Sequence, residues 1–246
     1  MTRRFRTDKR YKEFLVTSPE SLYMKYCTDV LRYLSPRGKF LDVGCGTGTA
    51  LRMLSRTRTR RDLFGIDVSG FFLKECRVKA NVRRYSGSRI PYPDGYFSVV
   101  GSFTVFEHVA DPYGFLREQI RVLEPGGVCI VATPNFLGIF NSVRGYSLRE
   151  KFMRVLRYAL GVPLEMNEPI ERPQFMPDDD AVVVANSIPI VRYFRAQGLR
   201  ILHNSGAMQP LPFPASILAR MPLLRLLLPS CYIIARKEKQ RSWRCA

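Results

Sequence analysis

The sequence predicts an α/β fold in which helices cover both faces of a mostly parallel sheet. Two observations predict it. Short apolar runs alternate with helix-like segments from about Lys39 to Asn135, an order typical of parallel strands joined by crossover helices. One of these runs, Val128–Thr133, is apolar throughout, as expected of a strand that is buried on both faces. We therefore expect a doubly wound sheet of seven strands in a single domain.

The expected strands are apolar runs that end beside glycine or polar turn residues. Val82–Tyr85 is the weakest of them, and the last two runs close the sheet after a long interruption. The set comprises Lys39–Val43, Leu63–Asp67, Val82–Tyr85, Phe97–Phe103, Val128–Thr133, Leu199–His203 and Cys231–Ala235.

Capping signals bound the expected helices. Asp111 is an N-cap followed by proline at the first helical position. Ser147 and Glu150 have the spacing of a capping box, and Gly161 is a stop signal. The expected helices are Thr49–Leu54, a helix capped by Ser69 that runs through Asn81, Tyr113–Leu123, Leu148–Leu160, and Asp180–Gln197 with an interruption or bend at Pro189.

The domain divides into four parts along the chain. We expect an N-terminal helical segment over 1–37, a core over 38–135, an insertion over 136–180, and a closing helix with strands over 181–246. The insertion follows the fifth expected strand.

Composition excludes several classes of protein. The chain has 246 residues, of which 46% are hydrophobic, so it can bury a sizeable core. Leu211–Pro229 is apolar but is interrupted by prolines and two arginines, so it cannot be a spanning helix. Met1–Arg10 is charged with no apolar segment after it and does not resemble a secretory signal. We expect a cytoplasmic protein, with peripheral membrane contact and an organelle address left open.

The net charge of +18 favours an anionic partner. Nucleic acid, an acidic membrane surface and a phosphorylated substrate all meet that description. The basic segments Arg3–Arg10 and Arg56–Arg61 lack the interleaved aromatic residues of a nucleic-acid stacking platform, so nucleic acid is not the favoured partner. The six cysteines lack C-x-x-C spacing, and we expect free thiols and no metal site.

The most specific motif lies at the end of the first expected strand. Gly44, Gly46 and Gly48 alternate with other residues before a helix, and Asp42 precedes them. Glycines permit positive φ and let backbone N–H groups approach a ligand. The spacing differs from the G-x-G-x-x-G of dinucleotide sites, and a carboxylate before the turn suits an ammonium group better than a pyrophosphate. A nucleoside with a cationic tail is therefore favoured.

A second carboxylate, Asp67, ends the second expected strand. At that position a carboxylate can accept hydrogen bonds from both hydroxyls of a ribose. One acid for an ammonium group and one for a ribose, on either side of a glycine turn, predict a site for S-adenosylmethionine (SAM).

With these motifs the chain resembles the class I SAM-dependent methyltransferases, in particular the branch that includes quinone-biosynthesis enzymes. The resemblance runs from about Phe40 to Asn135 and implies a Rossmann-like sheet whose last strand is antiparallel. It rests on Leu41–Gly48, Gly65–Ser69, Ile90–Phe97, Phe106–Pro112 and Leu123–Gly127.

The resemblance also implies roles for individual residues. The glycine turn would wrap the methionine part of SAM, Asp67 would bind the ribose, and Val68 would lie against the adenine. Glu107 and His108 sit where many relatives carry the same pair at the lip of the pocket, and they are the candidate catalytic residues. The candidate cofactor-binding residues are Asp42, Gly44, Cys45, Gly46, Gly48, Asp67, Val68, Ser88, Ser102 and Phe103.

Two positions depart from the family pattern. Relatives usually carry an Asp before the Pro-x-Pro-Asp-Gly block, where this chain has Ser86 and Ser88. They often carry another Asp where this chain has Ser98. At the first of these positions the contact with the adenine amino group would be weakened or made by a hydroxyl.

The acceptor is expected to be a small or lipid-like molecule, such as a sugar, a quinone-type ring or a lipid-linked glycan. Methylation of RNA or protein, motivated by the charge, and a non-catalytic binding subunit, motivated by the missing acids, stay open. The segment Leu148–Leu160 mixes basic and apolar residues. It could pack on the sheet as an ordinary amphipathic helix, form a lid, or present a basic face to anionic lipid. The sequence does not indicate an oligomeric state.

Overall fold

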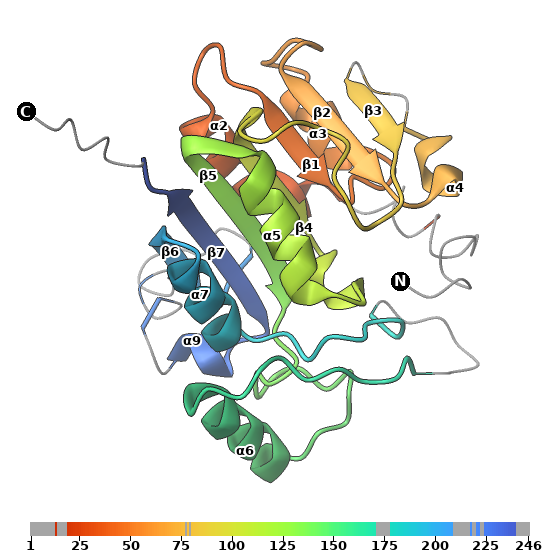
Figure 1. Ribbon diagram of the computed structural model, residues 1–246. Coiled ribbons are helices and arrows are strands. Elements are labelled where there is room, and N and C mark those ends of the chain that lie inside the picture. Colours follow the sequence, from red (N-terminus) through yellow and green to blue (C-terminus); the bar gives the residue numbers. More distant parts are fainter. Residues whose placement is uncertain are drawn as a thin grey trace, which may run out of the picture.

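The computed structural model describes residues 13, 19–76, 78, 80–170, 178–208, 217, 220, 221 and 224–239. It contains one seven-stranded sheet in the order β3-β2-β1-β4-β5-β7-β6 (Figure 1). All neighbouring pairs from β3 to β5 are parallel, and β7 is antiparallel to both β5 and β6. The strands are β1 (Phe40–Val43), β2 (Leu63–Asp67), β3 (Asn81–Arg84), β4 (Phe97–Phe103), β5 (Leu123–Pro134), β6 (Leu199–Ser205) and β7 (Ser230–Lys237). The predicted fold class is confirmed.

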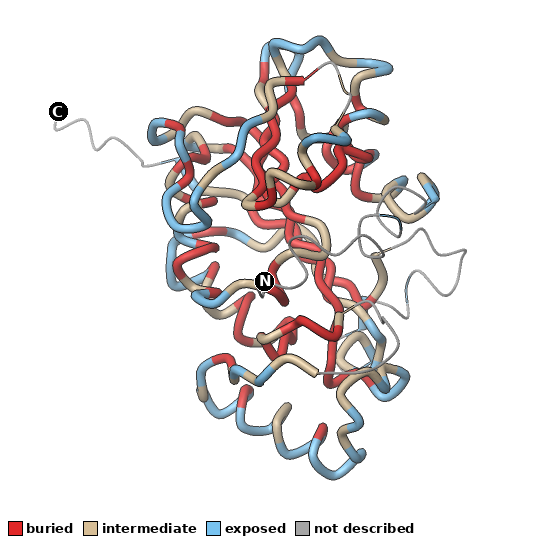
Figure 2. Tube along the Cα trace, turned by 90° about the vertical axis from the view of Figure 1, so that its right-hand side faces the viewer, coloured by how far each residue is buried: buried red, intermediate tan, exposed pale blue. Residues whose placement is uncertain are grey.

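Each face of the sheet has its own core. Side chains alternate along a strand, so Leu41 and Val43 of β1 join one hydrophobic cluster and Phe40 joins the other. Figure 2 shows the buried residues running through the middle of the molecule. The helices, which cover both faces, are η2 (Glu20–Tyr23), α2 (Met24–Tyr33), α3 (Thr49–Leu54), α4 (Gly70–Leu73), η3 (Phe106–His108), α5 (Pro112–Val122), α6 (Leu148–Ala159), α7 (Ser187–Ala196) and α9 (Leu224–Leu227).

Most expected helices match the structure at their starts. The hydroxyl of Ser147 accepts from the N–H of Glu150, and the Glu150 carboxylate accepts from the N–H of Ser147, which completes the predicted capping box. Asp111 accepts from the N–H of Gly114 at the start of α5. The capping signals in the sequence therefore predicted the starts of these two helices correctly.

Two helix predictions are wrong in extent. Ser69 does cap a helix, but α4 ends at Leu73 and Asn81 already belongs to β3. The helix expected from Asp180 begins at Ser187, with Asn186 as its N-cap. Pro189 therefore lies in the first turn, where the backbone nitrogen has no intrahelical acceptor, and it introduces no interruption.

The order of the strands reverses between β1 and β4. The chain runs outward from β1 through β2 to β3, and then continues on the other side of β1 with β4. Ligands of doubly wound sheets bind beyond the carboxyl ends of the strands at such a reversal. The sequence-predicted motifs lie at this edge. Among the described residues, no helix is both long and apolar enough to cross a bilayer.

Candidate functional site

A cavity of about 730 Å³ lies at the carboxyl edge of the sheet. The turn after β1, the end of β2 and the residues after β4 all contribute to its wall. Of the predicted cofactor and catalytic residues, the cavity is lined by Asp42, Gly44, Cys45, Gly46, Asp67, Val68, Ser88, Phe103 and His108. Gly48, Ser102 and Glu107 lie outside its lining.

The turn after β1 requires glycine for two separate reasons. Gly44, Gly46 and Gly48 all have positive φ, at 80°, 53° and 82°, a region that L-residues with a side chain rarely occupy. A Cβ on Gly44 would also lie 2.4 Å from a methyl of Val105. A Cβ on Gly48 would meet the Cys76 sulfur at 2.4 Å, so Gly48 shapes the turn without touching the cavity.

Asp67 ties the turn to the end of β2. One carboxylate oxygen accepts from the N–H of Gly46 at 2.9 Å, and the other accepts from the N–H of Ser69 at 2.7 Å. The side chain is held rigidly at the cavity wall. A carboxylate oxygen can accept more than one hydrogen bond, so Asp67 stays a candidate for binding a ribose.

Asp42 is a buried acid that α2 contacts. The hydroxyl of Tyr26 in α2 donates to its Oδ1 at 2.9 Å. Burial, with a smaller contribution from the nearby Asp67, raises the pKa of Asp42 to about 7 against the opposing effect of the Tyr26 hydrogen bond. A cationic ligand at this position would favour the ionised carboxylate, as the sequence motif suggested.

Phe103 and Ser102 point to opposite faces of β4 because they are consecutive strand residues. The Phe103 ring packs on Tyr23 and Tyr26, with centroids 4.7 and 5.4 Å away. Ser102 is fully buried, and its hydroxyl has no hydrogen-bond partner among the described residues. Phe103 lines the cavity and Ser102 does not, so a role of Ser102 at the cofactor stays a prediction.

A serine pair occupies the position of the missing adenine-binding acid. The hydroxyls of Ser86 and Ser88 lie 2.8 Å apart, and both residues line the cavity near Val68. Hydroxyls can both donate and accept. They can bond a base edge that an Asp would otherwise hold.

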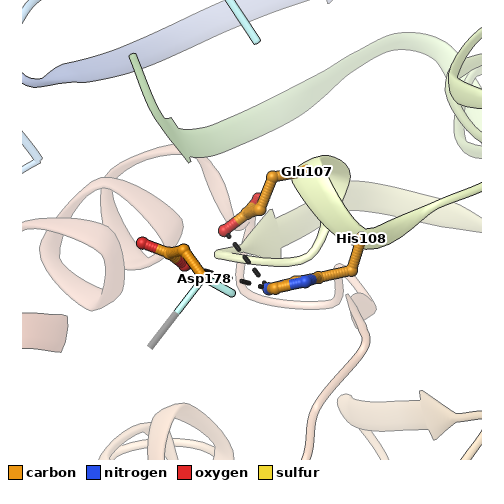
Figure 3. A group of neighbouring side chains, drawn as sticks. All are labelled: Glu107, His108 and Asp178. Carbon is orange, nitrogen blue, oxygen red and sulfur yellow. Dashed lines mark ion pairs between the residues drawn. The ribbon is translucent and has the colours of Figure 1, made fainter. Parts of the chain in front are cut away.

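The candidate catalytic pair belongs to a larger buried cluster (Figure 3). The His108 Nε2 lies 3.7 Å from Glu107 Oε1 and 4.0 Å from Asp178 Oδ1, and its Nδ1 lies 3.0 Å from Asp180 Oδ1. Glu107 is fully buried and accepts from the Thr133 hydroxyl at 2.9 Å. Only His108 of the predicted pair lines the cavity, and the catalytic role of Glu107 stays a prediction.

Burial and charge oppose each other in this cluster. Burial disfavours the charged imidazole of His108, but the carboxylates of Asp180, Glu107 and Asp178 outweigh it and raise its pKa to about 9. Burial raises the pKa of Glu107 to about 7, although the neighbouring imidazole acts in the other direction. At neutral pH the imidazole is therefore protonated.

Three side chains of this cluster could together offer ligand atoms to a metal ion. One atom each from Glu107, His108 and Asp178 lie within 4.8 Å of one another. Ion pairing between a protonated His108 imidazole and the two carboxylates also explains why these three side chains lie close together. The sequence-based expectation of no metal site stays a prediction.

Sequence reasoning missed several residues at this site. Tyr23 lines the cavity, Tyr26 holds Asp42, and Asp178 and Asp180 surround His108. No spacing signal marks them, since they come from segments distant in sequence. Asp178 has a φ of 70°, a value that side-chain-bearing residues seldom adopt.

Comparisons with known proteins agree with the geometry. Residues 41–131 match the family model described as a methyltransferase domain. Over 98 residues the chain is 34% identical to a probable S-adenosylmethionine-dependent methyltransferase of Mycolicibacterium smegmatis. This match covers 39% of this chain and 37% of the relative. It is 29% identical over 135 residues to a 2-methyl-6-phytyl-1,4-hydroquinone methyltransferase of Synechocystis, covering 50% of this chain and 41% of the relative. The chain thus spans about four-tenths of the length of these relatives.

Solved structures support the fold. A SAM-dependent methyltransferase of Aquifex aeolicus superposes with a TM-score of 0.57 at 16% identity, over 94% of this chain and 98% of that one. A Listeria monocytogenes structure described as a putative SAM-dependent methyltransferase gives a TM-score of 0.60 at 16% identity, over 89% and 99% of the two chains. At these identities the likeness concerns the fold.

Proposed function

We propose a function for a chain that carries a class I SAM-dependent methyltransferase domain of the quinone-biosynthesis branch: it transfers a methyl group from SAM to a small-molecule or lipid-like acceptor. A sugar, a quinone-type ring and a lipid-linked glycan are the acceptor types we favour. The observation that carries the proposal is the bond from the Gly46 N–H to Asp67. It joins the glycine turn and the ribose-type carboxylate at one wall of the cavity.

The residues of the cavity fit the parts of this cofactor. Asp67 has acceptor capacity for ribose hydroxyls, and Asp42 can pair with the ammonium group. Val68 and the Ser86–Ser88 pair can receive the base. When bound, SAM supplies a methyl group that is already electrophilic because the sulfur carries a positive charge. The protein has to align the acceptor and exclude water.

His108 is the residue that can handle a proton. It lines the cavity, and Asp180 fixes the imidazole by its Nδ1. A hydroxyl acceptor would lose its proton to Nε2, which requires the neutral imidazole. With a pKa of about 9, His108 would then favour reaction at alkaline pH. An amine, carbanion or thiolate acceptor needs alignment alone.

Binding of S-adenosylhomocysteine, followed by isothermal titration calorimetry, tests the cofactor part of the proposal. We expect heat of binding for the wild type and none for Asp67→Ala, which removes the ribose acceptor. Asp62→Ala is the matched control, because the Asp62 carboxylate accepts from the N–H and hydroxyl of Thr59 and does not line the cavity. Absence of heat in the wild type would favour a non-catalytic binding subunit, and equal heat in Asp67→Ala would refute the ribose role.

The acceptor is tested by mass spectrometry of cell extract incubated with the protein and isotopically labelled SAM. Labelled product in the small-molecule or lipid fraction supports the proposal. The net charge of +18 is the specific observation that favours RNA as a second candidate. Label confined to RNA or to protein would establish that alternative and reject a small acceptor.

A further inference from the structure

The amphipathic helix α6 turns its apolar side to the solvent. Leu148, Phe152, Leu156 and Leu160 follow one another at intervals of four residues, so they lie on one face. Their exposed fractions are 68%, 66%, 41% and 78%. An ordinary surface helix buries such a stripe against its domain, whereas α6 packs on the domain with its other side, through the buried Tyr158 and the partly buried Val155.

Polar groups hold α6 in this orientation. The ammonium group of Lys151 is buried and donates to the carbonyls of Gly138 at 2.8 Å and Asn141 at 2.5 Å. On the same side the hydroxyl of Tyr158 donates to the carbonyl of Val184 at 3.1 Å. Because these side chains face inward, the apolar stripe cannot rotate inward without breaking buried hydrogen bonds.

Further exposed apolar residues lie in the loop that Lys151 bonds and in α9. Ile139 and Phe140, in the loop that Lys151 holds, are 41% and 72% exposed. The N–H of Ile139 donates to the carbonyl of Leu227 in α9 at 2.9 Å, and Leu227 is itself exposed. We call the set of Ile139, Phe140, Leu148, Phe152, Leu156, Leu160 and Leu227 the apolar face.

The charges beside the apolar face are basic. Arg149 is exposed within the stripe, and Arg157 is exposed at its margin. The nearby carboxylates are engaged, since Glu150 caps Ser147, and Glu165 pairs with Arg154 and with Arg157 at 2.9 Å. The whole chain carries +18.

We propose that the apolar face docks on the surface of an anionic lipid bilayer. Interfacial helices insert an apolar stripe to the acyl boundary while arginines at its edge contact lipid phosphates. A second copy of this chain is a poorer occupant, because two strongly cationic surfaces would repel each other. Docking requires neither SAM binding nor methyl transfer, so it can hold or fail independently of the proposed function.

The position of the face suits a lipid-like acceptor. The segment that carries α6 leaves the sheet at the carboxyl end of β5 (Figure 1), the edge at which the cavity lies. A bilayer at α6 would therefore stand on the side of the molecule from which a membrane-dissolved acceptor approaches.

Flotation with phospholipid vesicles tests the proposal with the full-length protein. We expect binding to vesicles of phosphatidylcholine with phosphatidylglycerol and much weaker binding to pure phosphatidylcholine. Phe152→Ser should weaken binding about tenfold, since it removes one large apolar side chain from the acyl region. Arg149→Ala should weaken it about fivefold through the lost attraction to lipid charge.

Matched controls separate docking from general charge and hydrophobicity. Met24→Ser changes a side chain that is 52% exposed on α2, and Arg61→Ala changes an exposed arginine before β2. Both should leave vesicle binding unchanged. Equal losses in the controls, or equal binding of Phe152→Ser and wild type, would overturn the proposal. So would a wild-type dimer in sedimentation analysis that Phe152→Ser converts to a monomer without vesicle binding in either form.

Discussion

The imidazole of His108 is held by Asp180, whose Oδ1 lies 3.0 Å from Nδ1. The first residue ends η3 at the carboxyl edge of the sheet, and the second comes from the segment that precedes α7. The pair therefore links the residues after β4 to the segment between α6 and α7. It also fixes which ring nitrogen faces Glu107 and Asp178.

The first prediction concerns the titration of the two histidines. Burial lowers the pKa of His203 to about 4, and the carboxylates around His108 raise its pKa to about 9 despite burial. NMR of the imidazole ring protons should show one histidine titrating well below pH 6.5 and the other well above it. Asp180→Asn should lower the higher value, because it removes the carboxylate beside Nδ1. Two titrations near 6.5 in the folded protein would contradict this account.

The sign of the stability effect follows from the same shift. A histidine whose pKa is raised on folding contributes stability below its unfolded value of about 6.5, and that contribution is lost as the pH rises towards 9. We expect the thermal midpoint of the wild type to fall over this range relative to His108→Gln. A constant difference between the two proteins from pH 6 to pH 9 would count against a charged, paired imidazole.

The second prediction is that Asp42→Asn stabilises the protein while destroying the cofactor site. The pKa of Asp42 is raised to about 7 by burial, so the folded protein resists its ionisation, and stability declines as pH rises from about 4 to 7. Asparagine can still accept from Tyr26. At pH 8 the variant should melt above the wild type, with little difference at pH 4, and should bind S-adenosylhomocysteine more weakly. A variant that melts below the wild type at pH 8 would show that the charge is well compensated.

The third prediction separates backbone strain from steric overlap by comparing Gly44 of the glycine turn with Gly145, a glycine elsewhere that also has a positive φ. Gly44→Ala combines an unfavourable φ of 80° with a Cβ placed 2.4 Å from Val105. Gly145→Ala has a φ of 66° with no atom within 4 Å of the new Cβ. Denaturant unfolding should show a loss of about 1 kcal/mol for Gly145→Ala and about 3 kcal/mol for Gly44→Ala. Similar losses of unfolding free energy in both variants would mean that the Val105 side chain moves away from the new Cβ at little cost.

The fourth prediction concerns the arginine that fastens the loop before β4. Arg121 donates to the carbonyls of Ile90 and Tyr92 and pairs with Glu118 and Asp94. Arg121→Ala leaves these acceptors without their donor and should cost about 2 kcal/mol of unfolding free energy. The control Arg117→Ala removes an exposed arginine from the same helix. It should lower the free energy of unfolding by less than about 0.5 kcal/mol, as is usual for surface substitutions. A loss below about 0.5 kcal/mol for Arg121→Ala would show that the loop holds by packing alone.

The sheet and the cofactor-type wall were predictable because their signals are local. β2 and β4 have the bounds expected from sequence, and the turn at Gly44–Gly48 and Asp67 meet at the cavity as expected. Strand composition, glycine spacing and caps act over a few residues. Pairing of adjacent parallel strands then brings their carboxyl ends together without further information.

The features that the sequence did not predict depend on contacts between segments that are distant along the chain. Tyr26 reaches Asp42 because α2 packs on the face of β1 to which Asp42 points. Asp178 and Asp180 reach His108 because the N–H groups of Val182 and Val183 both donate to the Glu107 carbonyl. The same bonds keep that segment extended, so the helix expected from Asp180 starts at Ser187. The outward face of α6 likewise reflects the buried hydrogen bonds of Lys151, which outweigh its hydrophobic pattern.

The amide of Asn186, the N-cap of α7, donates to the side-chain oxygen of Asn135 at 3.1 Å, and the Asn135 amide in turn bonds the carbonyls of Leu226 and Leu228. The bond therefore holds the two ends of the stretch between the asparagines together beyond the end of β5. The N–H groups of Val182 and Val183, which both donate to the Glu107 carbonyl, attach the same stretch at a second place, so a chimaera that exchanges it should keep the parent sheet only if it retains both attachments.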